Sequence, residues 1–236
     1  GNPAELAYSD NSGASWTAVN IGSTNADFVP FDACVYALDL NNIWVGTDLG
    51  YIYYSDDAGL TWTAQESGTI TSDQYRAIHF ADKNVGIVGG ENNVLVKTID
   101  GGDTWSQVTM PSGQSADEIN AVVCIDKNRF WVGYSDGSIY YTLDGGSNWA
   151  QRSFTGSGSG AVKAMYFLND LVGYLVHNTS GPVGSVHQTF DGGQSWTKVT
   201  LPTNTGINSM FVCGDDKLFV AGEPQGSLGV IVKGIG

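Results

Sequence analysis

Residues 98–105 read TIDGGDTW, and nearly the same eight residues return as TLDGGSNW at 142–149 and TFDGGQSW at 189–196. Two looser copies come earlier, SDNSGASW at 9–16 and SDDAGLTW at 55–62. All copies end in a tryptophan, and these are Trp16, Trp62, Trp105, Trp149 and Trp196. Their spacing of 43 to 47 residues lies in the range of four-stranded propeller blades, although helical repeats have similar lengths.

The segments between these boxes have the pattern of short β-strands. One interval reads QYRAIHFAD, NVGIVGGEN, NVLVKTIDGG and DTWSQVT, and such runs of β-branched and aromatic residues between Gly, Asn and Asp are typical of strands and turns. A sustained 3.6-residue apolar period is absent, which excludes helical repeats. Each copy therefore predicts four antiparallel strands, A to D, with the box at the turn from C to D.

Four-stranded sheets of this kind bury their faces by packing against one another around an axis. The sequence therefore predicts an all-β fold, a β-propeller of four-stranded antiparallel blades, as a single domain over residues 1–236. Complete copies are expected at Phe31–Gln65, Gln74–Thr109, Glu118–Ser153 and Ala161–Thr200. Residues 1–20 supply C and D runs alone, and residues 207–236 supply A, B and C runs.

These incomplete ends predict five blades, with the ring closed by residues 1–20 pairing with residues 207–236, because closure removes two exposed sheet edges. The alternative is a six-bladed ring from a longer parent chain, since both ends carry a C run and compete for one position. The chain starts at Gly1 without a leader, which fits a protein that is processed or cut from a longer one.

The composition fits one acidic, turn-rich domain. Of 236 residues, 42% are hydrophobic, 14% are charged and 32 are Gly, as in turn-rich β proteins. The net charge of −14 repels phosphate backbones and anionic lipids, so neither nucleic acid nor direct membrane insertion is expected. Cys34, Cys124 and Cys213 lie in apolar runs, too far apart for a short metal motif, and are expected to be buried thiols.

The box reads Ser or Thr, any, Asp, any, Gly, any, any, Trp. Its acidic position holds Asn11, Asp57, Asp100, Asp144 and Asp191, and its glycine is Gly13, Gly59, Gly102, Gly146 or Gly193. An Asp side chain accepts hydrogen bonds from nearby backbone N–H groups, Gly tolerates a positive φ, and Trp fills space between sheets. A structural hairpin is therefore expected. A calcium loop is the alternative, but one carboxylate per box and the neutral Asn11 argue against it, so no metal or cofactor is expected.

This box resembles the Asp-box, or bacterial neuraminidase repeat (BNR), which occurs in sialidases, sortilin-like receptors, some glycoside hydrolases and photosystem II assembly factors. Five boxes at this spacing cover nearly the whole chain. The photosystem II assembly factors are most similar, because they consist of little more than these repeats. The resemblance implies a propeller and a non-catalytic scaffold that holds a protein partner. It implies no activity, because enzymes and non-enzymes share the repeat.

The two faces of the predicted propeller differ in the connections that they carry. The A-to-B and C-to-D turns emerge on one face, which is the box face, and the B-to-C and D-to-A connections emerge on the other. The B-to-C turns carry an acidic series, the candidate binding face, which is Asp48, Glu91, Asp136 and Glu223. These carboxylates predict attraction of a cation or a basic protein surface. The competing interpretation is that Asp, Glu, Asn and Gly simply form good turns.

An enzymatic site is not expected. A sialidase needs three convergent arginines, and Arg76, Arg129 and Arg152 are predicted in an A strand, an A-to-B turn and a D strand. Another glycoside hydrolase needs two carboxylates across a cleft, for which the candidates are Asp32, Asp73, Asp117 and Glu118. The sequence therefore predicts a non-enzymatic scaffold, without catalytic residues, that presents a rigid propeller for protein or glycan recognition. It is expected to be exported or displayed on a virion, particle or cell surface, within a larger assembly. The alternative is a glycan-active enzyme.

Overall fold

The computed structural model of the chain describes residues 6–9, 11–19, 21, 34–65, 73–111, 117–155, 160–179, 184–201, 206–213, 217–225 and 228–233. The described elements are strands and a short 3-10 helix, η1, at Glu91–Asn93. The strands form four antiparallel sheets of four strands, together with a two-stranded and a three-stranded sheet at the ends. The prediction of an all-β protein built from four-stranded antiparallel sheets is confirmed.

The four complete sheets, here the first to fourth blades, each pair their strands in chain order. The first blade contains β3 (Cys34–Ala37), β4 (Ile43–Gly46), β5 (Ile52–Ser55) and β6 (Thr63–Gln65). The second contains β7 (Tyr75–Phe80), β8 (Gly86–Gly90), β9 (Leu95–Thr98) and β10 (Ser106–Gln107). The third contains β11 (Ile119–Cys124), β12 (Phe130–Tyr134), β13 (Ile139–Thr142) and β14 (Ala150–Arg152). The fourth contains β15 (Ala161–Phe167), β16 (Gly173–Asn178), β17 (Gly184–Thr189) and β18 (Thr197–Val199).

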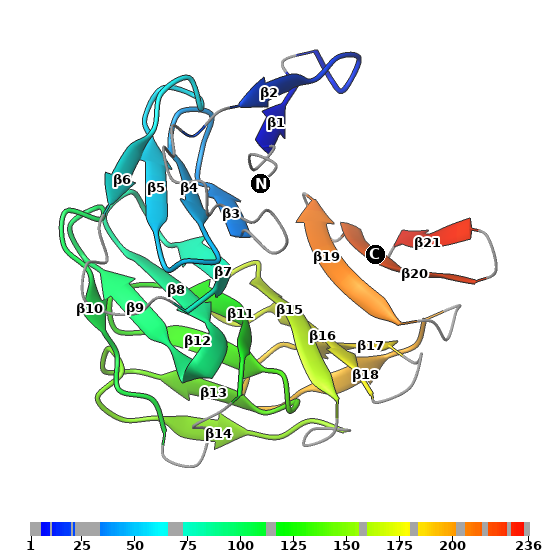
Figure 1. Cartoon of the computed structure of the whole chain (residues 1–236). Coiled ribbons are helices and arrows are strands. Elements are labelled where there is room, and N and C mark those ends of the chain that lie inside the picture. The colour runs from blue at the N-terminus through cyan, green and yellow to red at the C-terminus, as the bar shows by residue number, and fades with distance from the viewer. Residues whose placement is uncertain are drawn as a thin grey trace.

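The two ends of the chain form smaller sheets. Near the N-terminus β1 (Leu6–Tyr8) pairs with β2 (Thr17–Val19), and near the C-terminus β19 (Ile207–Cys213), β20 (Lys217–Gln225) and β21 (Leu228–Lys233) pair in that order. The sheets follow one another along an arc, with β1 and β2 at its upper end and β19 to β21 at the other (Figure 1). In the described residues the end sheets are separate, and pairing between residues 1–20 and 207–236 stays a prediction.

The core lies between neighbouring blades. Buried apolar clusters join the first blade to the second, the second to the third, the third to the fourth, and the fourth to β19 and β20. The blades approach closely where a B strand carries glycine: a Cβ on Gly89 would lie 2.5 Å from Ile119, and one on Gly133 would lie 2.5 Å from Val162. Side chains on the A strand of the next blade thus fill the space that each glycine leaves.

Candidate functional site

The box is a loop that satisfies its own polar groups. In the second blade the Asp100 carboxylate accepts hydrogen bonds from the Thr104 amide at 2.9 Å, the Thr104 hydroxyl at 2.5 Å and the Thr98 hydroxyl at 2.8 Å. The Thr98 hydroxyl also accepts a bond from the Gly102 amide at 2.8 Å. Gly102 has a φ of 95°, a conformation that favours glycine. The aspartate therefore binds its own backbone, as its residue type predicts.

The same pattern recurs at Asp57, Asp144 and Asp191, each of which accepts a bond from the amide four residues on. These donors stabilise the ionised carboxylates. Hydrogen bonds from the side chain and the amide of the residue four positions on hold the pKa of Asp144 and Asp191 at about 2. The same causes lower the pKa of Asp57.

The neutral Asn11 forms the same loop with one bond reversed. Its side-chain oxygen accepts bonds from the Ser15 amide at 2.9 Å and the Ser9 hydroxyl at 3.0 Å. Its side-chain nitrogen donates to the Ser15 hydroxyl at 2.7 Å, whereas the aspartates of other boxes accept from that position. A hydroxyl both donates and accepts, so the loop needs no negative charge.

The box tryptophans pack against aromatic residues in three blades. The rings meet edge to face, with centroids 6.0 Å apart for Trp105 and Phe80, 5.5 Å for Trp149 and Phe130, and 6.2 Å for Trp196 and Trp131. Trp16 differs, because 67% of its surface is exposed. The sheet of β1 and β2 contains no described A and B strands on which Trp16 would pack, so the expectation that this tryptophan fills space between sheets stays a prediction.

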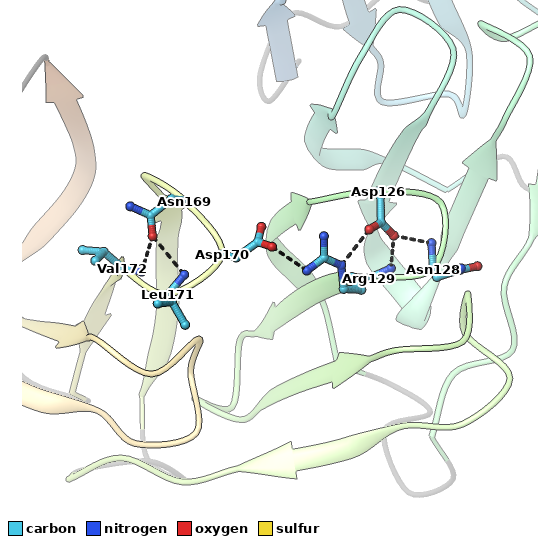
Figure 2. Close-up of polar contacts among 7 residues, drawn as sticks. All are labelled: Asp126, Asn128, Arg129, Asn169, Asp170, Leu171 and Val172. Carbon is cyan, nitrogen blue, oxygen red and sulfur yellow. Dashed lines mark hydrogen bonds and ion pairs between the residues drawn. The ribbon is translucent and has the colours of Figure 1, made fainter.

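The A-to-B turns contain a second repeated set of hydrogen bonds from backbone amides to an Asp or Asn side chain. This set was not expected from the sequence. Asp126 accepts hydrogen bonds at 2.8 Å from the amides of Asn128 and Arg129, and Asn169 accepts bonds at 2.9 Å from Leu171 and Val172 (Figure 2). Asp39 and Asp82 do the same in the first and second blades. The sequence feature that could have predicted these turns is an Asp or Asn at the end of each A run. Side chains of these residue types accept hydrogen bonds from the backbone two residues on.

Arg129 connects the third blade to the fourth on the box face. Its Nε lies 2.6 Å from Asp126, and its Nη1 lies 2.8 Å from Asp170 in the next blade (Figure 2). The structure therefore places this arginine between two carboxylates, and it brings Arg129 and Arg152 to one groove between these blades. Arg76 lies instead at the start of β7, on the candidate binding face.

On the candidate binding face, three members of the acidic series lie in connections from B to C. Asp48 and Asp136 are in turns, and Glu91 begins η1. Glu223 is a correction, because it lies within strand β20 rather than in a turn. The pairing of β20 with β21 shifts between Gly222 and Gln225, and this irregularity carries the strand beyond the expected turn.

Arg76 organises the acidic side chains where the second and third blades meet. Its Nη2 lies 2.8 Å from Glu91 of its own blade and 3.2 Å from Glu118 of the next. The Asn93 amide donates to the Asp117 carbonyl oxygen at 3.0 Å, across the same junction. Burial, together with the negative charge of Asp136, raises the pKa of Asp117. Negative charge therefore accumulates here beyond what one arginine offsets.

The catalytic alternatives fall on the same face. The Asp73 carboxylate accepts a bond from the Asn92 side chain at 2.9 Å, and Glu118 is paired with Arg76. Asp32 lies outside the described residues. No group of three His, Cys, Asp or Glu side chains with metal-binding geometry occurs among the described residues. Within that same part of the chain, no helix is long and apolar enough to cross a membrane.

The described thiols, Cys34 and Cys124, and the histidines lie in packed surroundings. Burial raises the pKa of the Cys34 and Cys124 thiols to about 12, and both are free. The Cys213 side chain lies outside the described side chains. His79 Nδ1 accepts a bond from the Cys124 amide at 3.2 Å, and His187 contacts the Ser185 hydroxyl at 3.0 Å. His79 therefore lies apart in the second blade, whereas His177 and His187 both belong to the fourth blade, with ring centroids 6.5 Å apart.

Comparison with known proteins agrees with this architecture. Residues 69–165 match the family described as photosynthesis system II assembly factor YCF48, and residues 53–64 match the BNR/Asp-box repeat. No curated protein matches the chain. The solved structure of YCF48 from Cyanidioschyzon merolae superposes with a TM-score of 0.71 at 18% identity, over 98% of this chain and 76% of that one.

Two further solved structures share the fold. A YCF48 bound to a D1 peptide gives a TM-score of 0.63 at 20% identity, over 85% of this chain and 68% of that one. An ancestral GH74 enzyme gives 0.59 at 17% identity, over 80% of this chain and 27% of that one. The resemblance drawn from the five boxes is confirmed: the chain carries BNR/Asp-box repeats, and its β-propeller domain is similar to that of the YCF48 photosystem II assembly factors.

Proposed function

We propose that the chain is a non-enzymatic scaffold that binds a basic segment of a protein partner on the candidate binding face. The observation that carries this proposal is the acidic junction between the second and third blades. There Glu91 and Glu118 share one arginine, and Asp136 adds enough negative charge to contribute to the raised pKa of Asp117. Such a concentrated field attracts cationic side chains and steers their approach.

Two further observations support a binding role. A protein of the same fold has been solved in complex with a peptide, the YCF48 bound to a D1 peptide. The chain as a whole carries a net charge of −14, which favours a basic partner over nucleic acid. The same charge suits a protein that is exported or displayed on a particle or cell surface within a larger assembly, which is the location that we propose.

We further propose a ring of five blades, closed between residues 1–20 and 207–236. Four blades are complete, β19 to β21 supply three strands, and β1 and β2 supply two. The ends together thus hold one strand more than a blade requires. In the closed ring β2 supplies the missing fourth strand beside β21, and β1 is displaced. A ring of six blades, with strands from a longer parent chain, is the alternative.

Peptide binding tests the scaffold function. We expect a fluorescein-labelled lysine-rich peptide to bind the purified chain and its glutamate-rich analogue not to bind, as measured by fluorescence polarisation. Asp117→Asn and Asp136→Asn each remove one charge without changing side-chain size, and each is expected to weaken binding about threefold to tenfold. Asp103→Asn, which removes the same charge from the box face, is the control.

Equal weakening by Asp103→Asn would show attraction to net charge alone and would remove the proposed site. Absence of lysine-peptide binding in buffer of low ionic strength would overturn the proposal entirely, because exposed charges are least screened there.

A glycan-active enzyme is the second candidate, favoured by the match to an ancestral GH74 enzyme. Asp117 supports it, since burial raises the pKa of this carboxyl, as a general acid requires. In that case Asp73→Asn and Asp117→Asn abolish glycoside hydrolysis without changing the Tm. If the unmodified chain hydrolyses none of a panel of plant and bacterial glycans, this candidate is excluded.

A further inference from the structure

A groove of about 540 Å³ separates the third and fourth blades on the box face. One wall comes from β13 and β14 with Tyr141 and Arg152, and the other from the A-to-B turn and the box of the fourth blade. Figure 2 shows part of this second wall, where Arg129 meets Asp170 beside Leu171. The candidate binding face lies at the opposite end of the blades.

The equivalent junctions earlier in the chain also carry grooves, of about 480 Å³ between the first and second blades and about 470 Å³ between the second and third, but a side chain bridges each of them. The Gln65 side-chain nitrogen donates to the Gly101 carbonyl oxygen at 2.6 Å, and the Lys97 ammonium donates to the Gly145 carbonyl oxygen at 2.9 Å. Each bond joins one blade to the first glycine of the next box. Among the described residues, no side chain donates to the corresponding carbonyl oxygen, that of Gly192. In the described part of the chain, the junction between the third and fourth blades therefore lacks the inter-blade hydrogen bond of the other two.

Arg152 occupies the strand position of Gln65, since these residues pair with Ile139 and Ile52 respectively. Its guanidinium does not reach the next box. It lies over the Tyr141 ring at 4.4 Å, Nη2 donates to the Tyr141 hydroxyl at 2.6 Å, and Nη1 makes a long bond of 3.4 Å to the Gln151 carbonyl oxygen. Arginine has five N–H donors, so the half-buried guanidinium retains unused ones.

Arg152 also differs from Arg129, because no ion pair among the described residues neutralises its charge. Arg129 is neutralised by Asp126 and Asp170, and Asp191 is engaged within its own box. Within the described part of the chain, no carboxylate lies within ion-pair distance of Arg152. In a chain of net charge −14, the Arg152 guanidinium is thus without an anionic partner among the described residues.

Large apolar side chains flank this cation. Leu143 is 64% exposed and Leu171 is 59% exposed, and both line the groove. Exposed apolar residues next to a concave surface commonly mark contacts with another protein. The groove thus combines one cation, one main-chain acceptor at Gly192 and two apolar contacts, which together match an extended peptide better than a small ion.

We infer that this groove binds an extended peptide segment of a protein partner that carries a carboxylate between apolar side chains. Arg152 holds the carboxylate with charge-assisted hydrogen bonds, Leu143 and Leu171 contact the flanking apolar side chains, and the Gly192 carbonyl oxygen accepts a peptide N–H. The inference rests on the proposed binding function, but it adds a second docking site on the other face with the opposite charge preference.

Short fluorescein-labelled peptides test this site on the full chain. One carries a central Leu-Glu-Leu between Gly and Ser residues, and its sibling carries Gln in place of Glu. We expect the Glu peptide to bind about tenfold more tightly, since a hydrogen-bonded ion pair is lost in the sibling. Arg152→Gln is expected to abolish this preference, and Arg152→Lys to reduce it, because lysine lacks the planar fork of arginine. Lys163→Gln, which removes a positive charge from an exposed residue of β15, is expected to preserve it.

Three results would overturn the inference: equal binding of the two peptides, an unchanged preference in Arg152→Gln, or stronger binding of an oligogalacturonate that has carboxylates but no apolar side chains. Thermal melts show whether each variant folds. If Arg152→Gln does not fold, Arg152→Lys takes its place in the binding test. Lysine-rich peptide binding, measured on the same samples, reports on the acidic face separately. Loss of one binding mode without the other distinguishes failure of this inference from failure of the proposed function.

Discussion

At the scale of single residues, the box aspartate has its hydrogen bonds supplied from within its own loop. Its donors lie two and four residues away in every described box with an aspartate. The sequence predicted this role because an Asp side chain in a tight turn accepts hydrogen bonds from backbone N–H groups close to it in the chain. The packing of Trp16 could not be predicted from its box alone, because it depends on A and B strands that the described sheet of β1 and β2 does not contain.

The reversed bond at Asn11 makes a prediction for another box. Asp100→Asn is expected to keep nearly the full thermal stability, because the Thr104 hydroxyl can turn to accept from the new amide as Ser15 does. Asp100→Ala removes the acceptor and is expected to lower the Tm by about 2 to 4 °C, a loss of about 1 kcal/mol. Differential scanning calorimetry measures both. An equal loss in the two variants would contradict the reversal.

Alanine substitutions at two box glycines allow the cost of backbone strain to be measured apart from the cost of overpacking. Gly59 and Gly193 have nearly the same φ, 83° and 82°. A Cβ on Gly59 would meet Trp62 at 3.5 Å, whereas one on Gly193 would lie 2.4 Å from Trp131. Gly59→Ala is therefore expected to cost about 1 kcal/mol from backbone strain alone. Gly193→Ala is expected to cost a further 1 to 3 kcal/mol, approximately, from overpacking.

Urea denaturation of the two glycine variants gives the comparison directly. Because the backbone angle is matched, their difference in the free energy of unfolding reports the contact with Trp131. If the two alanine variants were equally stable, the close approach of the fourth box to the third blade would carry no energetic weight.

At the scale of elements, each blade ties its box to its A-to-B turn. The Gly101 amide donates to the Asn84 carbonyl oxygen, and the Gly145 amide donates to the Asn128 carbonyl oxygen, both at 2.9 Å.

The strands were predictable from apolar alternation and turn residues, because both are local signals. The inter-blade bonds were not, since Gln65 and Lys97 have side chains that sequence alone leaves free to point into solvent.

His79 gives one such inter-blade contact a dependence on pH. Burial lowers the pKa of His79 from 6.5 to about 4. Between these values the unfolded chain takes up a proton that the folded chain does not, so the free energy of unfolding falls as the pH falls from 6.5 towards 4. Protonation also removes the acceptor for the Cys124 amide. We expect the free energy of unfolding of the His79→Gln variant to fall less steeply with pH. The difference in slope corresponds to at most about one bound proton.

Urea unfolding at several values between pH 7 and pH 4 measures this slope. Burial likewise lowers the pKa of His187 to about 4, so part of the slope is expected to remain in the His79→Gln variant. The box carboxylates contribute at lower pH, because their stabilising effect is lost only as the pH falls from about 4 towards 2. An identical slope in the variant and the unmodified chain would show that His79 titrates normally.

At the scale of the whole molecule, the period of the boxes predicted the order of the sheets, because each repeat is one supersecondary unit. The ends were harder to predict, since two C runs compete for one position. If residues 1–20 close the ring, their removal leaves β21 with an open edge. Amide hydrogen exchange across 207–233 is then expected to accelerate, while exchange in β11 to β14 stays unchanged.

The open arrangement makes the contrary prediction. If β1 and β2 do not pair with β21, deleting residues 1–20 leaves exchange across 207–233 as it was. Figure 1 shows the two end sheets on either side of the arc's opening, so the result decides between a five-bladed closure and a ring completed by strands from elsewhere.

The reversed hydrogen bond at Asn11 shows that the shape of the box loop does not depend on a negative charge at its acidic position. Where the fourth residue after the acidic position carries a hydroxyl, as Thr61, Thr104 and Ser195 do, the loop accommodates either an anion or an amide. An exchange of aspartate for asparagine at such a position therefore changes the electrostatic potential of the surface by one charge and leaves the turn intact.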